Sequence, residues 1–404
     1  MNQVNTIETQ NTNKNNLNTA MLILQVVGIV AVVMGHIDIG GEKLPNILNL
    51  AFPYYSWHMP FFIFVSGYFF NRTQKWGGYI LKKVKTHLLP ALAVNAVCGL
   101  FSMTLKRLDL TDFGQDITLD ALFVKPFTTG YQFFIDVSLW FIFSLFLIEV
   151  VACTMDRLVR GKGDLIYLVI TLAVALYCSY RCFYDPQGTK EEFLNMGLRQ
   201  GYLMFFFWLG ACYKRYAEGF CKKIFNYKTS IAIFAVQAIY LGMTGYKITT
   251  NVRNMVIKSI TVPDGYWVSI VAPITATIFF LGLAYQLAPY LGESKLLATI
   301  GRNTKYIVYY HQLIFTLFAV GLGALITAGY IDIPGFDFAR MRASNYYTCG
   351  NLALTAVIGI IAFAVPLIIG VFLKKQKLPI KIAGYALLTG LVMLILYLSS
   401  LAYA

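Results

Sequence analysis

The sequence has little charge, and its charge is not gathered in one place. Charged residues make up 13% of the 404 residues, which is about half the share found in ordinary soluble domains. The formal net charge is +14, yet the Lys and Arg residues are divided among short segments that separate apolar runs. A nucleic-acid-binding protein gathers them into one stripe or patch, so we expect no nucleic-acid partner.

Histidine is scarce, and the cysteines show no pattern of pairing. The chain contains 4 His and 7 Cys without the short Cys/His spacings of a zinc site, so we predict no metal centre. The odd number of cysteines, several of them in or beside apolar runs, argues against a disulfide framework. The first residues are polar and rich in Asn, and we therefore expect no cleavable signal peptide.

Apolar runs of roughly twenty residues recur along the whole sequence, and such a run can cross a bilayer as a helix. In total, 58% of the residues are hydrophobic. Because a helix satisfies its own backbone hydrogen bonds in lipid, the sequence predicts an all-α fold. We expect a polytopic transmembrane helical bundle with about ten core helices and one extra C-terminal helix. The predicted spans are 19–37, 50–70, 87–106, 133–155, 164–183, 196–213, 229–247, 266–288, 305–327, 350–373 and 382–403.

The predicted spans divide the chain into three parts and indicate its orientation. Residues 1–18 form a predicted disordered polar tail, residues 19–375 the main membrane domain, and residues 376–404 the extra helix. With a cytoplasmic N-terminus, every predicted inner loop is basic, whereas the first outer loops carry acids such as Asp38 and Asp109. This distribution matches the positive-inside rule and predicts a cytoplasmic N-terminus.

Two of the four histidines lie near the outer ends of the first two predicted spans. His36 ends the first span, and His58 lies in the run that opens the second. If these spans run in opposite directions, a pair of imidazoles at one depth could bind a substrate hydroxyl and take its proton. The alternative is that both lie at headgroup level, with His58 in an interfacial aromatic belt. That belt comprises Tyr54, Tyr55 and Trp57.

Three other features concern the packing of these spans. Pro60 is predicted to bend the second helix, whereas Ser66 and Gly67 would allow another helix to approach closely. Glu149 lies inside the fourth span, where an acid requires a partner that the sequence does not name.

The segment Gly301–His311 opens the ninth span from the inner side. Arg302 and Lys305 would lie at the headgroup level, with Asn303 or Thr304 capping the helix. A helix N-terminus with two cations suits a phosphate of a cytoplasmic donor, although lipid headgroups suit it as well.

The segment from Arg72 to His87, just before Leu89-Pro90, is the most basic predicted inner loop. Its cations, Lys82 and Lys83 among them, could also receive an anionic donor. The alternative is that topology alone accounts for their charge.

Taken together, these segments resemble the acyltransferase-3 family of integral membrane O-acyltransferases, and within it the fucose 4-O-acetylase-like branch. The resemblance covers roughly residues 19–375 and rests on the order and spacing of short motifs along one chain. The motifs are Gly35-His36, His58-Met59-Pro60-Phe61-Phe62, Ser66-Gly67-Tyr68, the basic segment before Leu89-Pro90, Leu139-Trp140-Phe141, and Gly301-Arg302-Asn303-Thr304 leading to His311.

The resemblance implies ten core helices and transfer of an acyl group from cytoplasmic acyl-CoA to a cell-surface glycan or lipid-linked sugar. It also implies a location in the inner (cytoplasmic) membrane of a bacterium. The catalytic histidine of the family corresponds to His36. Gln25 replaces the basic residue found eleven positions before that histidine, and Leu22 replaces an acid common in the fucose branch.

We therefore predict an O-acyltransferase, in the simplest case an O-acetyltransferase, that uses acetyl-CoA or another acyl-CoA as co-substrate and holds no permanent cofactor. His36 would act as general base or form an acyl-histidine intermediate, and His58 would orient the acceptor or assist proton transfer. The predicted donor-binding residues are Gln25, Arg72, Lys82, Lys83, Arg302 and Lys305. The aromatic residues predicted to stack against a sugar are Tyr54, Tyr55, Trp57, Tyr266 and Trp267.

A second hypothesis is a translocator of glycan or lipid-linked sugar, or a non-catalytic partner subunit, on the same scaffold. Gln25 favours it, because the usual basic residue is missing there and a translocator needs no acyl-CoA. Binding of acetyl-CoA separates the two hypotheses. An ion channel fits poorly, since no ladder of ionisable residues crosses the predicted spans.

Overall fold

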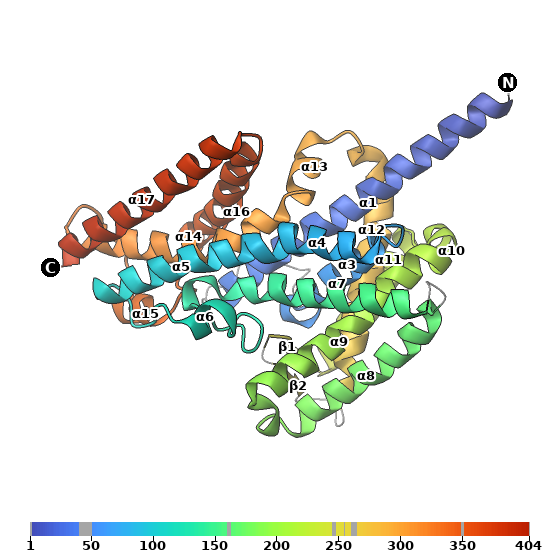
Figure 1. Cartoon of the computed structure of the whole chain (residues 1–404), viewed down its shortest axis with the longest axis horizontal. Coiled ribbons are helices and arrows are strands. Elements are labelled where there is room, and N and C mark those ends of the chain that lie inside the picture. The colour runs from blue at the N-terminus through green and yellow to red at the C-terminus, as the bar shows by residue number, and fades with distance from the viewer. Residues whose placement is uncertain are drawn as a thin grey trace. The chain divides into compact units, whose positions relative to one another are not determined.

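The computed structural model describes residues 2–39, 51–159, 163–244, 248–253, 255–259, 265–348 and 351–403. These residues are almost entirely helical (Figure 1), and the predicted all-α class is confirmed. Within this part of the chain the one sheet is an antiparallel hairpin of β1 (Ile248–Asn251) and β2 (Val256–Ser259).

The chain divides into two compact units, each built from separate stretches of sequence. The first unit comprises residues 1–31, 46–82 and 147–302, and the second comprises residues 32–45, 83–146 and 303–404. Three helices contribute residues to both units: α1 (Asn2–Ile39), α4 (Trp76–Lys83) and α7 (Trp140–Leu158). Because α1 begins at Asn2, it starts before the first predicted span, and the disorder expected for residues 1–18 stays a prediction.

The remaining helices each belong to one unit. In the first unit they are η1 (Tyr54–Ser56), α3 (His58–Tyr68), α8 (Asp164–Tyr184), η4 (Gly188–Lys190), α9 (Glu192–Cys212), η5 (Tyr213–Ala217), α10 (Glu218–Ile224), α11 (Tyr227–Thr244), η6 (Gly265–Trp267), α12 (Val268–Leu291) and α13 (Lys295–Gly301). In the second unit they are η2 (Val84–Leu88), α5 (Leu89–Arg107), α6 (Leu119–Phe123), η3 (Phe134–Leu139), α14 (Thr304–Thr327), α15 (Phe338–Ala343), α16 (Leu352–Lys374) and α17 (Leu378–Tyr403).

Eight helical segments among the described residues are long and apolar enough to cross a membrane. They are Thr19–Ile37, Trp76–Arg107, Phe134–Leu158, Asp164–Tyr184, Gly265–Leu291, Thr304–Thr327, Leu352–Lys374 and Leu378–Tyr403. Each coincides with a predicted span, as expected of an integral membrane protein. The predicted spans 50–70, 196–213 and 229–247 are not among them.

The second predicted span is wrong as a complete transmembrane helix. Its helix, α3, has 11 residues, which gives a length of about 16 Å at 1.5 Å per residue, whereas a bilayer core is about 30 Å thick. Pro60 lies in the first turn of α3, where its nitrogen is not needed for an intrahelical hydrogen bond. Pro60 therefore marks the start of the helix instead of bending it.

The basic segment Arg72–His87 is a loop only as far as Lys75, and the loop predicted beyond it is wrong. From Trp76 the chain is helical through α4, the π-helical turn η2 and α5. In the π turn the nitrogen of Leu89 donates to the carbonyl of Val84, five residues earlier. Pro90 has no N–H to donate to the helix. Because the hydrogen-bond register is shifted just before it, the helix continues through the proline.

In the first unit, α3 crosses α9 at two glycines. A Cβ at Gly67 would lie 1.9 Å from the carbonyl oxygen of Phe207, and one at Gly210 would lie 2.0 Å from that of Phe64. Such backbone contact is possible only without a side chain, so the close approach predicted at Gly67 is confirmed.

Ser66 lies beside that crossing and forms a hydrogen bond to another helix. Its hydroxyl donates a hydrogen bond of 2.8 Å to Oε1 of Glu149 in α7. The structure thus identifies a partner that the sequence did not show for this buried acid.

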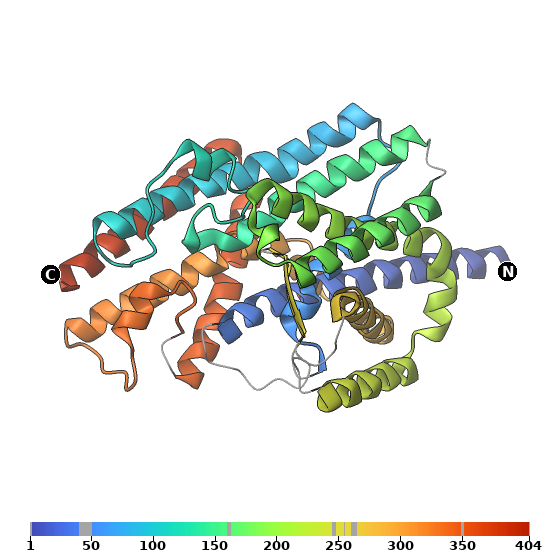
Figure 2. The same cartoon turned by 90° about the horizontal axis from the view of Figure 1, so that it is seen from below.

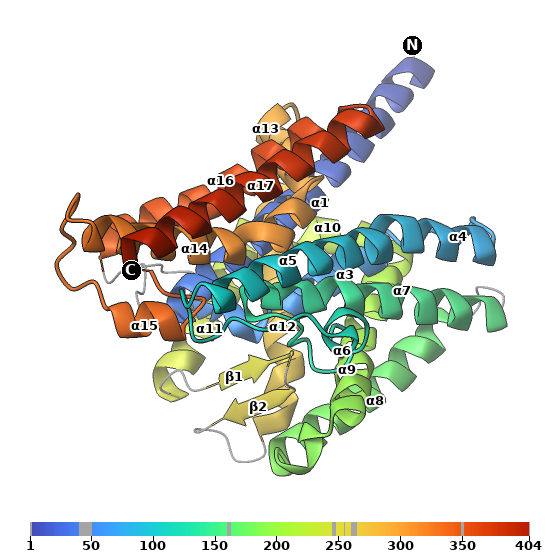
Figure 3. The same cartoon turned by 60° about the vertical axis from the view of Figure 1, so that its left-hand side comes forward.

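In the second unit, α14 packs against η3, α16 and α17, and α17 also lies along α5 (Figures 2 and 3). Ser138 in η3 donates from its hydroxyl to the carbonyl of Val308, at 3.0 Å. The end of α1 is buried in the same unit, because Ile37 lies directly over Gly359 of α16. These contacts hold the turn that carries His36 within the unit that contains α14.

Candidate active site

Two histidines far apart in the sequence meet in the second unit. Nδ1 of His36, near the end of α1, lies 2.7 Å from Nε2 of His311 in α14. The ring centroids are 4.9 Å apart, and the ring planes differ by 17°. His311 is fully buried, whereas His36 is half-buried. His36 is therefore the member of the pair that a substrate can approach.

The contacts of His311 fix the positions of the ring protons. Nδ1 of His311 lies 2.7 Å from the carbonyl oxygen of Ile307, which can only accept, so a neutral His311 carries its proton on Nδ1. Nε2 of His311 then has a lone pair and accepts a hydrogen bond from Nδ1 of His36. In neutral His36 the basic nitrogen is consequently Nε2.

Gln312 faces that basic nitrogen. Its Nε2 lies 3.3 Å from Nε2 of His36 and 3.4 Å from the hydroxyl of Tyr346. The orientation of the amide is set at its other end, because Oε1 accepts a 3.0 Å hydrogen bond from the backbone nitrogen of Ser138. The NH₂ group therefore points toward the lone pair of His36.

Tyr346 covers one face of the His36 ring, with centroids 5.2 Å apart and planes at 24°. The segment that carries it is held by two residues that precede Tyr346. The side-chain amide of Asn345 donates to a backbone carbonyl of η3, and Arg342 donates to the carboxylate of Asp109 at 2.7 Å. Hydrogen bonding to Asp109 raises the pKa of Arg342, so this anchor stays charged.

This geometry suits general base catalysis on a hydroxyl group. If Nε2 of His36 takes a proton, the resulting imidazolium keeps its Nδ1 donor bond to the neutral His311. His311 thus occupies the orienting place that a carboxylate has in a serine-hydrolase triad. Within the described residues, no group of three or more His, Cys, Asp or Glu side chains could hold a metal ion.

His58, the other predicted catalytic histidine, belongs to the first unit and lies at the start of α3. It is buried, and its Nδ1 is hydrogen-bonded to the carbonyl oxygen of Tyr54, which is buried as well. The ring of Tyr55 stands edge-on to it at 5.2 Å. A part for His58 in catalysis stays a prediction.

The other predicted sugar-binding aromatic residues are in the first unit, in different surroundings. Trp57 is buried among phenylalanines, and its Nε1 donates to the carbonyl of Phe52 at 3.0 Å. Tyr266 packs edge-on against Tyr180, with centroids 5.5 Å apart. Trp267 is 41% exposed and lines a cavity of about 220 Å³. Sugar stacking stays a prediction for all five residues, and Trp267 has the surroundings that fit it best.

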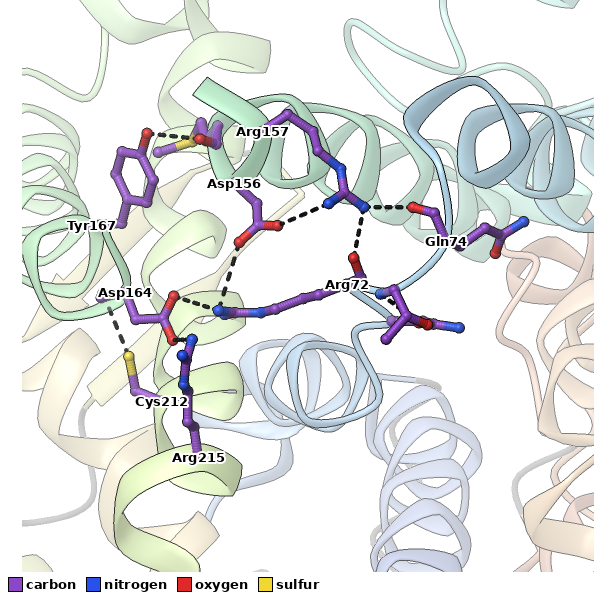
Figure 4. A network of polar contacts seen from close by, with 11 residues as sticks. Arg72, Gln74, Asp156, Arg157, Asp164, Tyr167, Cys212 and Arg215 are labelled. Atoms are coloured by element: carbon purple, nitrogen blue, oxygen red, sulfur yellow. Dashed lines mark hydrogen bonds and ion pairs between the residues drawn. The ribbon is translucent and has the colours of Figure 1, made fainter. Parts of the chain in front are cut away.

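Arg72, a predicted donor-binding residue, takes part in an ion-pair network of the first unit (Figure 4). Its Nη1 lies 2.5 Å from Oδ1 of Asp164 and 3.6 Å from Oδ1 of Asp156. Arg215 reaches the other oxygen of Asp164 at 3.1 Å, and Arg157 donates to the backbone carbonyl of Arg72 at 2.8 Å. The network ties together the chain segments that follow α3, α7 and α9. Its two aspartates are buried, so Arg72 has a structural role, and donor binding by Arg72 stays a prediction.

The remaining predicted donor-binding residues are divided between the two units and differ in burial. Gln25 is half-buried in the part of α1 that belongs to the first unit, and Lys82 and Arg302 are exposed in that unit. Lys83 is half-buried at the end of α4, and Lys305 lines a cavity of the second unit. Donor binding by these residues stays a prediction.

A family model described as an acyltransferase domain matches residues 18–375, a region that includes α1, η3 and α14. The chain belongs to the acyltransferase-3 family. This membership indicates that the protein is a membrane acyltransferase. Helix α17 of this acyltransferase begins at Leu378, beyond the matched region. No curated protein and no solved structure matches the chain.

The sequence alone does not show which residues surround His36 in this acyltransferase. In the sequence, His311 stands out only as the end of a motif. No role is predicted for Gln312, Ser138 or Tyr346. Two adjacent polar residues, His311 and Gln312, inside an apolar span are a signal that could have been used. Ser138 orients Gln312 through its backbone nitrogen, which has no signature in the sequence.

Proposed function

We propose that this acyltransferase moves an acyl group, in the simplest case acetyl, from cytoplasmic acyl-CoA to a hydroxyl of a glycan or lipid-linked sugar. The observation that carries the proposal is the 2.7 Å contact between His36 and His311, which makes Nε2 of His36 a base. The likeness of the motifs to the fucose 4-O-acetylase-like branch supports an acetyl donor and a sugar acceptor. The basic inner segments support a cytoplasmic N-terminus in a bacterial inner membrane.

In the proposed reaction, the acceptor hydroxyl takes the place of the Gln312 amide at Nε2 of His36, and the amide keeps its contact with the hydroxyl of Tyr346. The contact of 3.3 Å between Gln312 and His36 is longer than an ordinary hydrogen bond, so exchange costs little. The hydroxyl oxygen attacks the thioester carbon while its proton passes to His36. The C–S bond then breaks, and the CoA thiolate takes up that proton from His36.

A covalent route uses the same nitrogen. Nε2 of His36 attacks the thioester carbon, and the C–S bond breaks to release CoA thiolate. The acyl group then passes from His36 to the acceptor oxygen, and the thiolate takes up the hydroxyl proton. This route leaves acyl label on the protein when no acceptor is present, whereas the general base route does not.

The test is turnover of radiolabelled acetyl-CoA by the full chain in liposomes, with a membrane extract as the source of acceptor. We expect His36→Ala to abolish label transfer and His87→Ala, a change of a histidine outside the pair, to retain it. Label held by wild-type protein but not by His36→Ala would select the covalent route. Full transfer by His36→Ala would show that His36 is neither base nor nucleophile.

A second candidate is a translocator or non-catalytic partner, which the neutral Gln25 favours at the donor end. Equilibrium binding of acetyl-CoA to the purified protein separates it from the enzyme. No binding, together with movement of a lipid-linked sugar across liposomes, would favour the translocator.

A further inference from the structure

The second unit contains a cavity of about 450 Å³ between α5, α14, α16 and α17. Its size falls within the range of about 300–1,000 Å³ that is usual for small-molecule sites. Most of its lining is apolar, with Val94, Leu313 and Leu388 contributing from three helices. The one charged residue among its described lining residues is Lys305, in the first turn of α14.

The cavity is separate from the histidine pair. Apart from Lys305, the lining residues of α14 recur at spacings of one, three and four residues, so they share one face of the helix. They are Tyr306, Tyr309, Tyr310, Leu313, Ile314 and Leu317. His311 and Gln312 fall on the opposite face. An acyl donor in this cavity would have α14 between itself and His36.

Helix α17 closes the cavity and is attached to the unit near both of its ends. Near its start, a Cβ at Gly384 would lie 2.5 Å from the side chain of Leu373. At its end, the hydroxyl of Tyr403 donates to the carbonyl of Val320 at 3.0 Å. Between these points its side chains line the cavity, and most of the helix is otherwise exposed. Lipid surrounding the helix therefore lies next to the cavity.

Two lysines approach each other where α14 begins and α16 ends. Nζ of Lys374 donates at 3.0 Å to Oδ1 of Asn303, whose side chain makes this contact instead of the cap predicted for α14. Lys374 and Lys305 repel each other there, because Lys305 follows Asn303 by only two residues at the start of α14. Neither forms an ion pair with a carboxylate of the described residues. An anion at this position would reduce that repulsion.

We propose that the cavity holds an acyl chain of an anionic phospholipid, with the phosphate beside Lys305 and Lys374. An apolar cavity is not filled by water, and an empty one loses packing contacts, whereas the surrounding membrane supplies acyl chains. The paired lysines select the anionic headgroup. The cavity lies on the other face of α14 from His311, and the proposal assigns Lys305 to the lipid phosphate in place of the acyl donor.

The test is the phospholipid content of the full chain, purified in mild detergent and measured by quantitative mass spectrometry. Leu388→Trp fills the cavity, and Leu387→Trp is its control because Leu387 is 75% exposed on the same helix. Lys305→Gln removes the charge at the cavity, and Lys377→Gln is its control at an exposed position. Val392→Phe, a smaller filling change on the same face, replaces Leu388→Trp if that variant does not fold.

We expect wild type and both controls to retain a phospholipid enriched in anionic headgroups relative to the membrane. Lys305→Gln should lower its retention about tenfold, the loss expected for one charge-assisted contact, and the filling variants should remove it. Equal retention by Leu388→Trp and Leu387→Trp, with Val392→Phe also unchanged, would overturn the proposal. A retained zwitterionic lipid, free fatty acid or acyl-CoA would overturn the choice of occupant.

Discussion

The basicity of Nε2 in His36 depends on a carbonyl oxygen two hydrogen bonds away. The carbonyl of Ile307 holds the proton of His311 on Nδ1, and this leaves Nε2 of His311 as the acceptor for His36. A neutral acceptor orients the ring without adding a negative charge inside the protein, where an unpaired carboxylate would be costly. The role of His311 is therefore to position His36, and the reaction takes place at Nε2 of His36.

Replacing His311 tests this positioning role. His311→Ala removes the acceptor for Nδ1 of His36, and we expect kcat to fall about 10²- to 10⁴-fold, the range for a disturbed general base. KM for acyl-CoA should change little, because His311 is buried. His311→Gln retains a side-chain acceptor and should recover part of kcat. Steady-state kinetics in liposomes measure both constants, and an unchanged kcat in His311→Ala would contradict the assignment.

Gln312 connects the candidate site to the stability of the fold. In Gln312→Leu the backbone N–H of Ser138 loses its acceptor in a buried place. An unsatisfied buried donor costs about 1–3 kcal/mol, so thermal unfolding in detergent should shift to lower temperature. Gln312→Glu is the matched control, because its side chain keeps an oxygen that can accept the hydrogen bond from the backbone N–H of Ser138. An unfolding temperature for Gln312→Leu equal to that of wild type would show that this hydrogen bond does not hold η3 on α14.

At the scale of elements, the crossing of α3 and α9 depends on two backbones in contact. Gly67→Ala places a methyl group 1.9 Å from the carbonyl oxygen of Phe207, and we expect a loss of about 1–3 kcal/mol in the free energy of unfolding. The control is Gly197→Ala in the same α9, where an added Cβ meets nothing within 4 Å. That change should be neutral or stabilise the helix by about 0.5–1 kcal/mol. Thermal unfolding of both variants in detergent measures the difference, and equal values would contradict the close crossing.

The segment that carries Tyr346 is anchored by Arg342, whose guanidinium lies 2.7 Å from Asp109 and 3.0 Å from Asp112. These carboxylates are exposed, so Arg342→Gln should cost no more than about 1 kcal/mol in stability. Activity should fall further than stability, because the ring that covers His36 is no longer held in place. The measurement is kcat/KM beside the unfolding temperature, with Arg340→Gln as the control. Equal kcat/KM in the two variants would show that the anchor does not serve the site.

The sequence predicts these elements better than it predicts their partners. Apolar length alone locates eight spans that the structure retains, because burial in lipid is a property of one segment at a time. The pairing of His36 with His311 joins residues 275 positions apart, and no local pattern encodes it. Two other predictions were wrong for a similar reason, because α3 begins only at His58 and the helix continues through Pro90. Each depends on where a proline falls within a helical turn, which hydropathy does not show.

At the scale of the whole molecule, charge and helix count together constrain the topology. Four lysines at the junction of α16 and α17, at positions 374, 375, 377 and 381, predict that this junction is cytoplasmic. Seven of the eight candidate spans precede it. If the N-terminus is also cytoplasmic, the number of crossings before the junction is even. An odd number among α3, α9 and α11 must then cross as well, although none of them is a candidate span by length and composition.

Reporter fusions test this topology directly. We expect a reporter at the N-terminus and one at Lys377 to report the cytoplasm, and one after Ala404 to report the opposite side, since α17 crosses once more. A fusion between α8 and α9, at Gln187, then shows how α9 and α11 contribute. Gln187 lies outside if an odd number of crossings precedes it. That number is odd only if α3 and the chain before it cross the membrane, despite the 11 residues of α3. A cytoplasmic reporter at Gln187 with a cytoplasmic N-terminus would mean that α3 does not cross, and the missing crossing would then belong to either α9 or α11.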